Sequence, residues 1–228
     1  ARFYPDKDLP GVTYFEPVTN QNFTVYPFNA ANPMAGDAVA ENGTGLLRRY
    51  LQWMVQVVGV DGFRLDAEKH MEQFALKQFD SAVYRANPRP RLDGSIDHVF
   101  MYGEVVPGDG QAQGQSNQDF LYSYVRKDIN PATPNTVGGN RDVLDFALRG
   151  AMNDNLSGNG VQNDWRNVVN SSIDVRDDGF HNGSAGVMFA SNHDGGGPAL
   201  SNVAHAYILT QPGNAIVYYN ADQFDDPN

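Results

Sequence analysis

The chain has 228 residues, of which 41% are hydrophobic, so it is long enough to bury one sizeable core. Its 27 acidic residues outnumber the 16 basic ones, which argues against nucleic acid or an anionic membrane as the main partner, because both bind clustered Lys and Arg. There is no cysteine, so disulfides and thiolate chemistry are excluded. No run of about 18 apolar residues predicts a membrane span. The first residues lack the regions of a signal peptide, and the compartment stays open, secretion included.

Two parts are expected along the chain. Residues 1–40 are rich in Pro, Asn, Gly and aromatics without a helical period, which predicts loop with short strands. Beyond them, apolar residues recur at helical spacing over 46–58, and either Asn42 or Thr44 is available as the N-cap. We therefore expect a loop-rich segment over 1–40 and the main domain over 41–228.

Strand and helix patterns alternate through the rest of the chain. Gly59 would end the first helix, and a short apolar run follows over 62–65. Further strands are expected at 98–106, 143–148, 186–194 and 214–220, and further helical segments at 71–82, 165–173 and 201–211. This alternation predicts an α/β fold with a parallel sheet and helices packed outside it. The stretch 108–119, rich in Gly, Gln and Asn, is expected to be an exposed functional loop.

Charged residues stand at the carboxyl ends of three expected strands. Arg64 and Asp66 close the first, Glu104 closes the second, and His193 with Asp194 closes a later one. In parallel α/β architectures this is the face at which sites form. A cleft there explains the charge, because Arg64 can offset the cost of placing Asp66 at its floor.

Three motifs then resemble one known family. The stretch GFRLDAEKH, 62–70, resembles the second signature of the alpha-amylase family of glycoside hydrolases, in which an Arg, an Asp two residues later and a Lys-His pair occur on the fourth barrel strand. YGEV, 102–105, resembles the third signature, and FASNHD, 189–194, resembles the fourth. The motifs occur in the family's order, and NAIVYYN, 214–220, looks like the eighth strand.

The resemblance implies a (β/α)8 TIM barrel, of which this chain would hold strands four to eight as a parallel sheet with outer helices. The first signature and anything like the first three strands are absent from the sequence. We therefore expect an internal piece of a longer protein, whose missing N-terminal half of the barrel would be a partner of this chain. Residues 1–40 would then be the tail of the excursion after strand three, and 41–228 the C-terminal part of the catalytic barrel.

The resemblance also implies three catalytic roles. Asp66 would be the nucleophile that attacks the anomeric carbon, and Glu104 would be the general acid and then the general base. Asp194 would stabilise the oxocarbenium-like transition state and hold sugar hydroxyls. Two such carboxylates cleave a glycosidic bond with retention, through a covalent glycosyl intermediate. The structural alternatives are a helix N-cap for Asp66, an ordinary Gly-Glu dipeptide for Glu104 and an exposed turn for Asp194.

Four more residues would bind substrate by resemblance. Arg64 would orient Asp66 and keep it ionised, with a structural ion pair as the alternative, and His193 would donate to a sugar hydroxyl. Lys69 and His70 would contact the acceptor side, with a solvated helix as the alternative. The His70 carbonyl contacts calcium in family members that have the metal, so the resemblance allows a structural calcium ion and implies no other cofactor.

The expected function is that of a retaining glycoside hydrolase that acts on alpha-linked glucans such as starch, or on related alpha-glucosides. Its partner would be an oligosaccharide or polysaccharide, and neither nucleic acid nor a membrane. Transglycosidases and isomerases of the family share these signatures, so transfer and isomerisation stay open. A non-catalytic carbohydrate-binding fragment is a further alternative, although an intact Asp, Glu, Asp trio argues against it.

Overall fold

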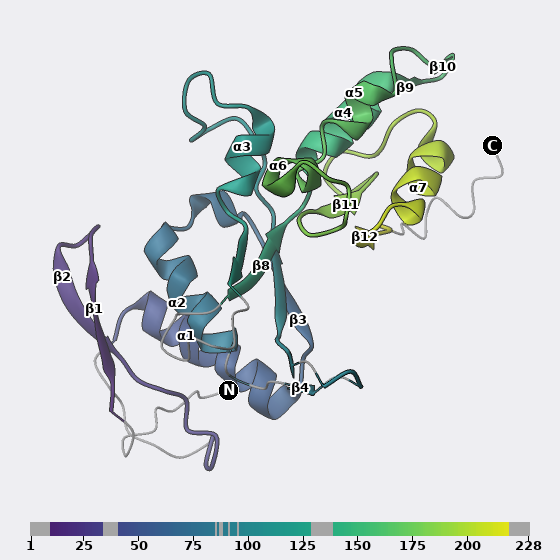
Figure 1. Ribbon diagram of the computed structural model, residues 1–228. Helices are drawn as coiled ribbons and strands as arrows, with labels where there is room; N and C mark the ends of the chain where they lie inside the picture. The colour runs from purple at the N-terminus through teal and green to yellow at the C-terminus, as the bar shows by residue number, and fades with distance from the viewer. Residues whose placement is uncertain are drawn as a thin grey trace. The chain divides into compact units, whose positions relative to one another are not determined.

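The computed structural model describes residues 10–33, 41–84, 86, 89–90, 92–94, 96–128 and 139–218, which form a mixed α/β fold with small sheets (Figure 1). The chain divides into two compact units. The first consists of Ala1–Arg64, His70–Met101 and Arg126–Arg141, and the second of Leu65–Lys69, Tyr102–Val125 and Asp142–Asn228. Within the described ranges, every helix is too short or too polar to cross a bilayer.

The first unit contains an antiparallel hairpin and two packed helices. Strands β1 (Val12–Glu16) and β2 (Gln21–Val25) pair along their whole length, which confirms short strands in the loop-rich segment. Helices α1 (Gly43–Trp53) and α2 (Gln73–Tyr84) pack against each other (Figure 1) and confirm the two helical patterns expected there. A short antiparallel pair also lies in this unit, β4 (Arg89–Pro90) with β5 (Ile96–Asp97).

Helix α1 begins and ends at the signals that the sequence carries. The side chain of Asn42 caps it by accepting the Gly45 N–H at 3.1 Å. The helix continues as a π-helical turn, η1 (Met54–Val58), and stops at Gly59, whose φ of 82° lies in the left-handed region that glycine adopts without strain. Its apolar face is only partly covered, with Leu51 and Val55 buried and Leu46, Leu47 and Val58 exposed.

One sheet has four strands, in the order β3-β6-β8-β7. Its strands are β3 (Gly62–Leu65), β6 (Phe100–Gly103), β7 (Arg126–Asp128) and β8 (Gly139–Val143). Strand β7 runs antiparallel to β8 and was not among the expected strands. The apolar runs expected to form strands at 62–65 and 98–106 do so, the second over a shorter range.

The carboxyl ends of four strands follow one another in chain order within the second unit. Backbone N–H groups of Glu104 and Leu144 donate to the carbonyls of Leu65 (2.8 Å) and Gly103 (2.9 Å), respectively. Leu144 also forms a parallel bridge with Val187 in β11 (Val187–Phe189), which pairs in parallel with β12 (Asn214–Ile216). A (β/α)8 barrel would place its strands in this sequential order, and the barrel itself stays a prediction. Residues 219–220 of the expected last strand lie outside the described residues.

The expected strand at 143–148 is misplaced. Strand β8 ends at Val143, and helix α4 (Phe146–Asn155) begins after Asp145, whose Oδ1 accepts the Leu148 N–H at 2.9 Å. The run VLDFAL therefore crosses from a strand into the first turn of a helix. An aspartate is a strong N-cap, and this capping outweighs the strand propensity of its apolar neighbours.

The described part of the second unit contains five helices. They are α3 (Asn117–Tyr122), α4, α5 (Arg166–Val169), α6 (Asp174–Asp178) and α7 (Ser201–Thr210), together with the 3-10 turn η2 (Glu68–His70) and the short hairpin of β9 (Leu156–Ser157) and β10 (Gly160–Val161). The helix expected at 201–211 is confirmed. The one expected at 165–173 is only a single turn, α5, followed by further turns.

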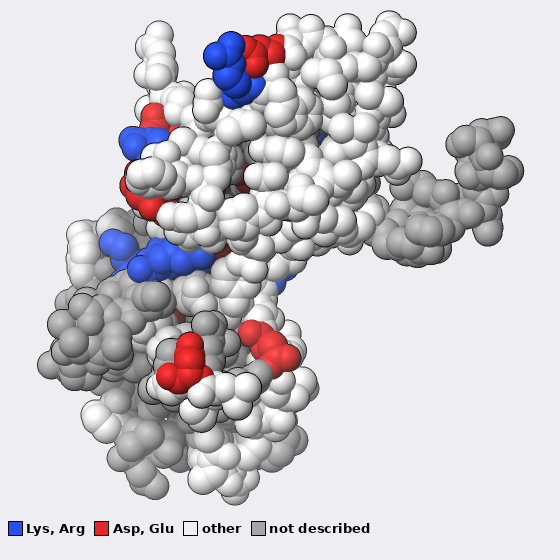
Figure 2. Space-filling model, turned by 45° about the vertical axis from the view of Figure 1, so that its right-hand side comes forward, with Lys and Arg blue, Asp and Glu red and all other residues white. Residues whose placement is uncertain are grey.

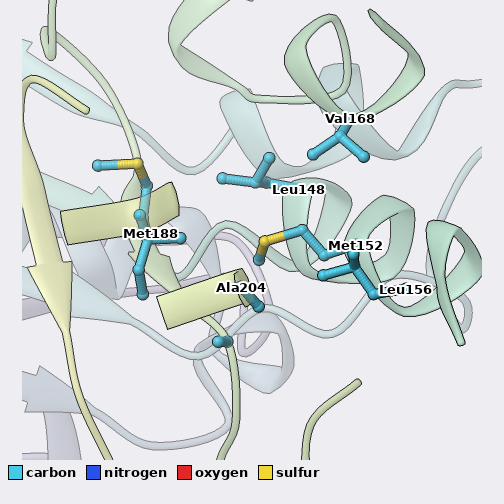
Figure 3. Close-up of a cluster of buried hydrophobic side chains, with 8 residues drawn as sticks. Leu148, Met152, Leu156, Val168, Met188 and Ala204 are labelled. Carbon is cyan, nitrogen blue, oxygen red and sulfur yellow. The ribbon is translucent and has the colours of Figure 1, made fainter. Parts of the chain in front are cut away.

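The core of the second unit lies between α4 and its neighbours. Figure 3 shows Leu148 and Met152 of α4 facing Met188 of β11, with Val168 and Ala204 beside them. Met152, Val168 and Ala204 are completely buried. A second apolar cluster joins the end of β8 to α3 and α4, through Val105, Phe120, Leu121, Val143, Ala147 and Ile173.

Three buried aspartates fix the segment that leads into β11. Asp142, Asp145 and Asp174 are buried, with at most 6% of each residue exposed. Asp142 accepts the Gly186 N–H at 2.7 Å, and Asp145 accepts the Ile173 N–H at 3.0 Å. Asp174 accepts the Gly183 N–H at 2.9 Å.

Charged side chains form small groups on the face of the surface drawn in Figure 2, separated by uncharged residues. In places an acidic group lies next to a basic one.

Candidate active site

Asp66 lies on a strained turn directly after β3. Its side chain is exposed, and the next residue, Ala67, has a φ of 48°, a left-handed conformation that is uncommon for residues with a Cβ. Backbone strain of this kind is concentrated at functional sites, where the surrounding structure has to enforce it. The turn then continues into η2, so Asp66 is not the N-cap of a long helix.

Glu104 is bound to the residues on both sides of Asp66. It follows β6 and is 9% exposed. Its N–H donates to the Leu65 carbonyl at 2.8 Å, and its carbonyl accepts the Glu68 N–H at 2.9 Å. The Ala67 N–H also points to the Glu104 carboxylate, at 3.4 Å from Oε2. The two expected catalytic carboxylates therefore stand at the ends of neighbouring strands, on backbone that is hydrogen-bonded together.

Lys69 connects this turn to the loop after β6. Its Nζ donates to the Val106 carbonyl at 3.1 Å, and its own carbonyl accepts the Tyr124 hydroxyl at 3.4 Å. Lys69 is half-buried, its hydrogen bond to Val106 is exposed, and its contact with the acceptor side stays a prediction. His70, the last residue of η2, is exposed. Arg64 is exposed on β3, and its expected ion pair with Asp66 stays a prediction.

The loop after Glu104 is held by its own glutamines. Gln111 Nε2 donates to the Gln115 carbonyl at 2.6 Å, and Gln111 Oε1 accepts the Gly108 N–H at 3.2 Å. Gln115 Oε1 in turn accepts the Ala112 N–H at 3.1 Å. These contacts fix the conformation of residues 108–115, which follow Val106, the residue whose carbonyl accepts the hydrogen bond from Lys69.

His193 and Asp194 form the tip of a tight turn. Asn192 and Gly196 are bridged across its base, and Asn192 Oδ1 accepts the Gly195 N–H at 2.9 Å. At the tip, His193 Nε2 lies 3.4 Å from Asp194 Oδ1, and both side chains are more than half exposed. The exposed-turn alternative thus describes both the backbone and the side chains of this turn, and the sugar contacts of His193 and Asp194 stay a prediction.

The expected calcium contact is at the backbone carbonyl of His70. Ca²⁺ takes six to eight oxygen ligands, whereas the resemblance names a single backbone carbonyl, that of His70. Among the residues that the structure describes, no group of three or more His, Asp or Glu side chains is placed to hold a metal ion. The calcium contact of His70 stays a prediction.

Two residues near the site were missed by sequence reasoning. Glu68 lies within the charged run after Asp66 and is nevertheless fully buried against Gly103. Arg149, in α4, donates through Nη2 to the carbonyls of Gly195 and Gly196, just after Asp194. The glycine before Glu104 is a signal for the first contact. Arg149 has no local signal, because its partners lie 46 and 47 residues away.

Comparison with known proteins gives three distant relatives, and no protein-family model matches the chain. The chain is 28% identical over 194 residues to a cyclomaltodextrin glucanotransferase of Paenibacillus macerans, across 78% of this chain and 23% of the relative. It is 28% identical over 178 residues to a cyclomaltodextrin glucanotransferase of Bacillus licheniformis, across 73% of this chain and 20% of the relative. A beta/alpha-amylase of Paenibacillus polymyxa is 29% identical over 89 residues, across 36% of this chain and 6% of the relative.

The chain thus spans less than a quarter of the length of each of these relatives. Their names agree with the resemblance carried by the three motifs. These distant matches support a relationship between this chain and the glycoside hydrolases and transferases of the alpha-amylase family.

Proposed function

We propose that this chain carries the catalytic groups of a retaining glycosidase that acts on alpha-linked glucans. The observation that supports it most is the hydrogen bonding of Glu104 to the residues on both sides of Asp66. A retaining mechanism needs two carboxyl groups about 5 Å apart on opposite sides of the bond that breaks. Two carboxylates on adjoining strand ends, one exposed and one largely buried, suit that requirement.

In the proposed mechanism, Asp66 attacks the anomeric carbon while Glu104 gives a proton to the leaving oxygen. A covalent glycosyl-Asp66 intermediate results, and the leaving sugar departs with the proton. Glu104, now ionised, takes a proton from water or from an acceptor hydroxyl, which attacks the intermediate and frees Asp66. Asp194 and His193 hold hydroxyls of the sugar in the transition state, and Lys69 and His70 border the acceptor.

For the fold we propose part of a (β/α)8 barrel, with β3, β6, β8, β11 and β12 as its strands four to eight. The proposal is supported by the sequential order of the strand ends and by the parallel pairing of β11 with β12. In such a barrel the catalytic groups lie at the carboxyl ends of the strands. Asp66, Glu104 and Asp194 each follow a strand in this way.

Transfer is a second candidate, and a specific observation favours it. The two relatives that match most of this chain are both glucanotransferases by name. Hydrolysis and transfer share the first half reaction and differ in whether water or a sugar hydroxyl attacks the intermediate. Product analysis separates them, because transfer from maltotriose yields longer or cyclic glucans whereas hydrolysis yields only shorter sugars of retained configuration.

Trapping of the intermediate tests the proposal in the complete protein. We expect Glu104→Gln to accumulate a covalent adduct on the peptide that contains Asp66 when it is given a fluorinated alpha-glucosyl fluoride, because the first step needs little acid help with that leaving group. Mass spectrometry of the digested protein locates the adduct. General acid-base catalysis is worth about 10² to 10⁴ in rate, and turnover of maltotriose should fall accordingly.

Asp154→Asn is the matched control, since Asp154 is an exposed carboxylate on α4 with no role in the proposed chemistry. It should turn over maltotriose at the unsubstituted rate, while Asp66→Asn should neither turn over nor form the adduct. An adduct on another peptide, or products of inverted configuration, would contradict the roles given to both carboxylates. Binding of maltotriose without any turnover would favour a non-catalytic carbohydrate-binding protein.

A further inference from the structure

Arg149 binds the backbone of the turn that carries His193 and Asp194. Its Nη2 donates to two successive carbonyls, those of Gly195 at 3.0 Å and Gly196 at 2.8 Å. These carbonyls come directly after Asp194 in the chain. A charged guanidinium makes stronger hydrogen bonds than a neutral donor, so this contact restrains the backbone on the C-terminal side of Asp194.

The turn needs such a restraint because of its composition. Three glycines, residues 195–197, follow Asp194, and glycine loses more conformational freedom on folding than any other residue. Gly196 has a φ of 55°, in the left-handed region that favours glycine. Within the turn, the Asn192 side chain holds the Gly195 N–H, and Arg149 holds the carbonyl of the same residue.

Arg149 is itself held in place by the strand that leads into the turn. Its guanidinium carbon lies 5.6 Å from the centre of the Phe189 ring, at the end of β11. Phe146, one turn earlier on α4, packs edge-on against the same ring, with the ring centres 4.9 Å apart. Helix α4 therefore holds both the entry to the turn, through Phe189, and its exit, through Gly195 and Gly196.

We propose that Arg149 is a positioning residue for Asp194 and His193. It fixes the backbone of their turn, so that the two side chains are preorganised to hold sugar hydroxyls in the transition state. This inference rests on the proposed function, because the sugar contacts are those assigned there to Asp194 and His193. Preorganised groups stabilise a transition state more than groups that must first be ordered, so loss of Arg149 reduces catalysis without removing any group that touches the substrate.

Hydrogen exchange tests the positioning without reference to activity. In Arg149→Met we expect the amides of residues 192–197 to exchange about 10-fold faster or more, because the turn opens locally, while the amides of the α4 core around Met152 keep their protection. Arg149→Lys keeps the charge but reaches the two carbonyls less well, so the exchange rates of these amides should lie between those of the unsubstituted protein and those of Arg149→Met. Arg166→Met is the control, since Arg166 pairs with its near neighbour Asp164 on the surface. Unchanged exchange of the turn in Arg149→Met would overturn the proposal.

A double-mutant cycle with Asp194→Asn tests the catalytic consequence. For maltotriose we expect Arg149→Met to lower kcat/KM by about 10-fold or more in the unsubstituted protein, and by no more than about 2-fold in the Asp194→Asn background, because the residue it positions is already lost. Arg149→Lys should recover part of the loss. Equal losses in both backgrounds would mean that Arg149 acts on stability alone, and would overturn the positioning role.

The hydrogen-exchange experiment and the double-mutant cycle together separate this inference from the proposed function. If the unsubstituted protein does not turn over maltotriose, the proposed function fails, and the exchange of residues 192–197 still decides whether Arg149 orders the turn. If the unsubstituted protein is active and both arms give the expected result, the positioning role stands together with the function.

Discussion

The carboxylate of Glu68 occupies the space that a side chain on Gly103 would need. A Cβ atom added at Gly103 would overlap this carboxylate and lie 3.0 Å from the Cβ of Glu68. Glu68 is completely buried, and its N–H donates to the Glu104 carbonyl at 2.9 Å. Since Glu68 comes two residues after Asp66, this close packing helps to set the spacing between the two strand ends that carry the proposed catalytic carboxylates.

Gly103→Ala should therefore damage both stability and the site. The new methyl group has to displace a buried carboxylate, and overpacking of this kind costs about 1–3 kcal/mol and sometimes more. We expect a lower free energy of unfolding in urea. Gly150→Ala is the control, because Gly150 lies within α4 with open space around its Cα, so that replacement should be neutral or slightly stabilising.

Shortening Glu68 should relieve the clash. In the double variant Gly103→Ala, Glu68→Ala, the loss of stability should be smaller than the sum of the two single losses, because the alanine methyl group occupies part of the space that the carboxylate leaves. Strictly additive losses would show that the two positions do not compete for the same space.

Asp145 should make stability depend on pH. Burial raises the pKa of this carboxyl group from 3.8 to about 6, even though Leu148, Ile173 and Ser172 all donate to it. The unfolded chain would ionise near pH 4, whereas the folded protein keeps the proton until about pH 6. The folded state therefore binds more protons in this window, and its stability should fall by about 3 kcal/mol as the pH rises from 4 to above 6.

The measurement is the free energy of unfolding in urea between pH 4 and pH 7, compared with that of Asp145→Asn. Asparagine has nearly the same shape and does not titrate. The difference in free energy of unfolding between the aspartate and the asparagine protein should fall as the pH rises, by at most about 1.4 kcal/mol per pH unit. A difference that grows in favour of the aspartate as the pH rises would mean that the hydrogen bonds outweigh burial, and that the pKa lies below its ordinary value.

Local patterns were sufficient for much of this fold. The helical period and the signals at Asn42 and Gly59 predicted α1 with its ends, and the charges that close two apolar runs predicted Asp66 and Glu104 at the carboxyl ends of two strands. These features depend on residues close together in sequence. The order of β3 and β6 was expected from the resemblance, and their adjacent ends agree with it.

What could not be predicted depends on contacts between distant residues. The sequence around Glu68 indicates one more charge in a solvated run, whereas its burial depends on the absence of a side chain at Gly103, which is 35 residues away at the end of β6; the glycine before Glu104 is the one signal of this contact. Arg149 lies between Leu148 and Gly150 in α4, and nothing near it in sequence indicates that it donates to the carbonyls of Gly195 and Gly196. The boundary between β8 and α4 was missed because the capping by Asp145 competes with an apolar run that continues past it.

A buried ion pair supports the first unit, and its removal should be costly. Asp80, on α2, is completely buried, and its Oδ1 accepts the Nε–H of Arg141, on β8, at 2.9 Å. Arg126 lies 3.6 Å away as a second cation. Burial raises the pKa of Asp80, and the charge of Arg141 opposes that rise. Removing one member of a buried pair typically costs about 3–5 kcal/mol, because the other charge is left in a medium that solvates it poorly.

We therefore expect Arg141→Met to lose stability at pH 7, and to lose less at pH 4. Without Arg141 the pKa of Asp80 rises further in the folded state, so the carboxyl group is neutral at low pH and its burial then costs less; the penalty returns as the pH rises through the folded pKa. Adding Asp80→Leu should recover much of the loss, because an apolar pair of similar volume replaces the ion pair. Urea unfolding of the single and double variants at both pH values checks this. A loss in Arg141→Met that is the same at pH 4 and pH 7 would mean that packing of the arginine stem, and not the charge of Asp80, makes the pair important.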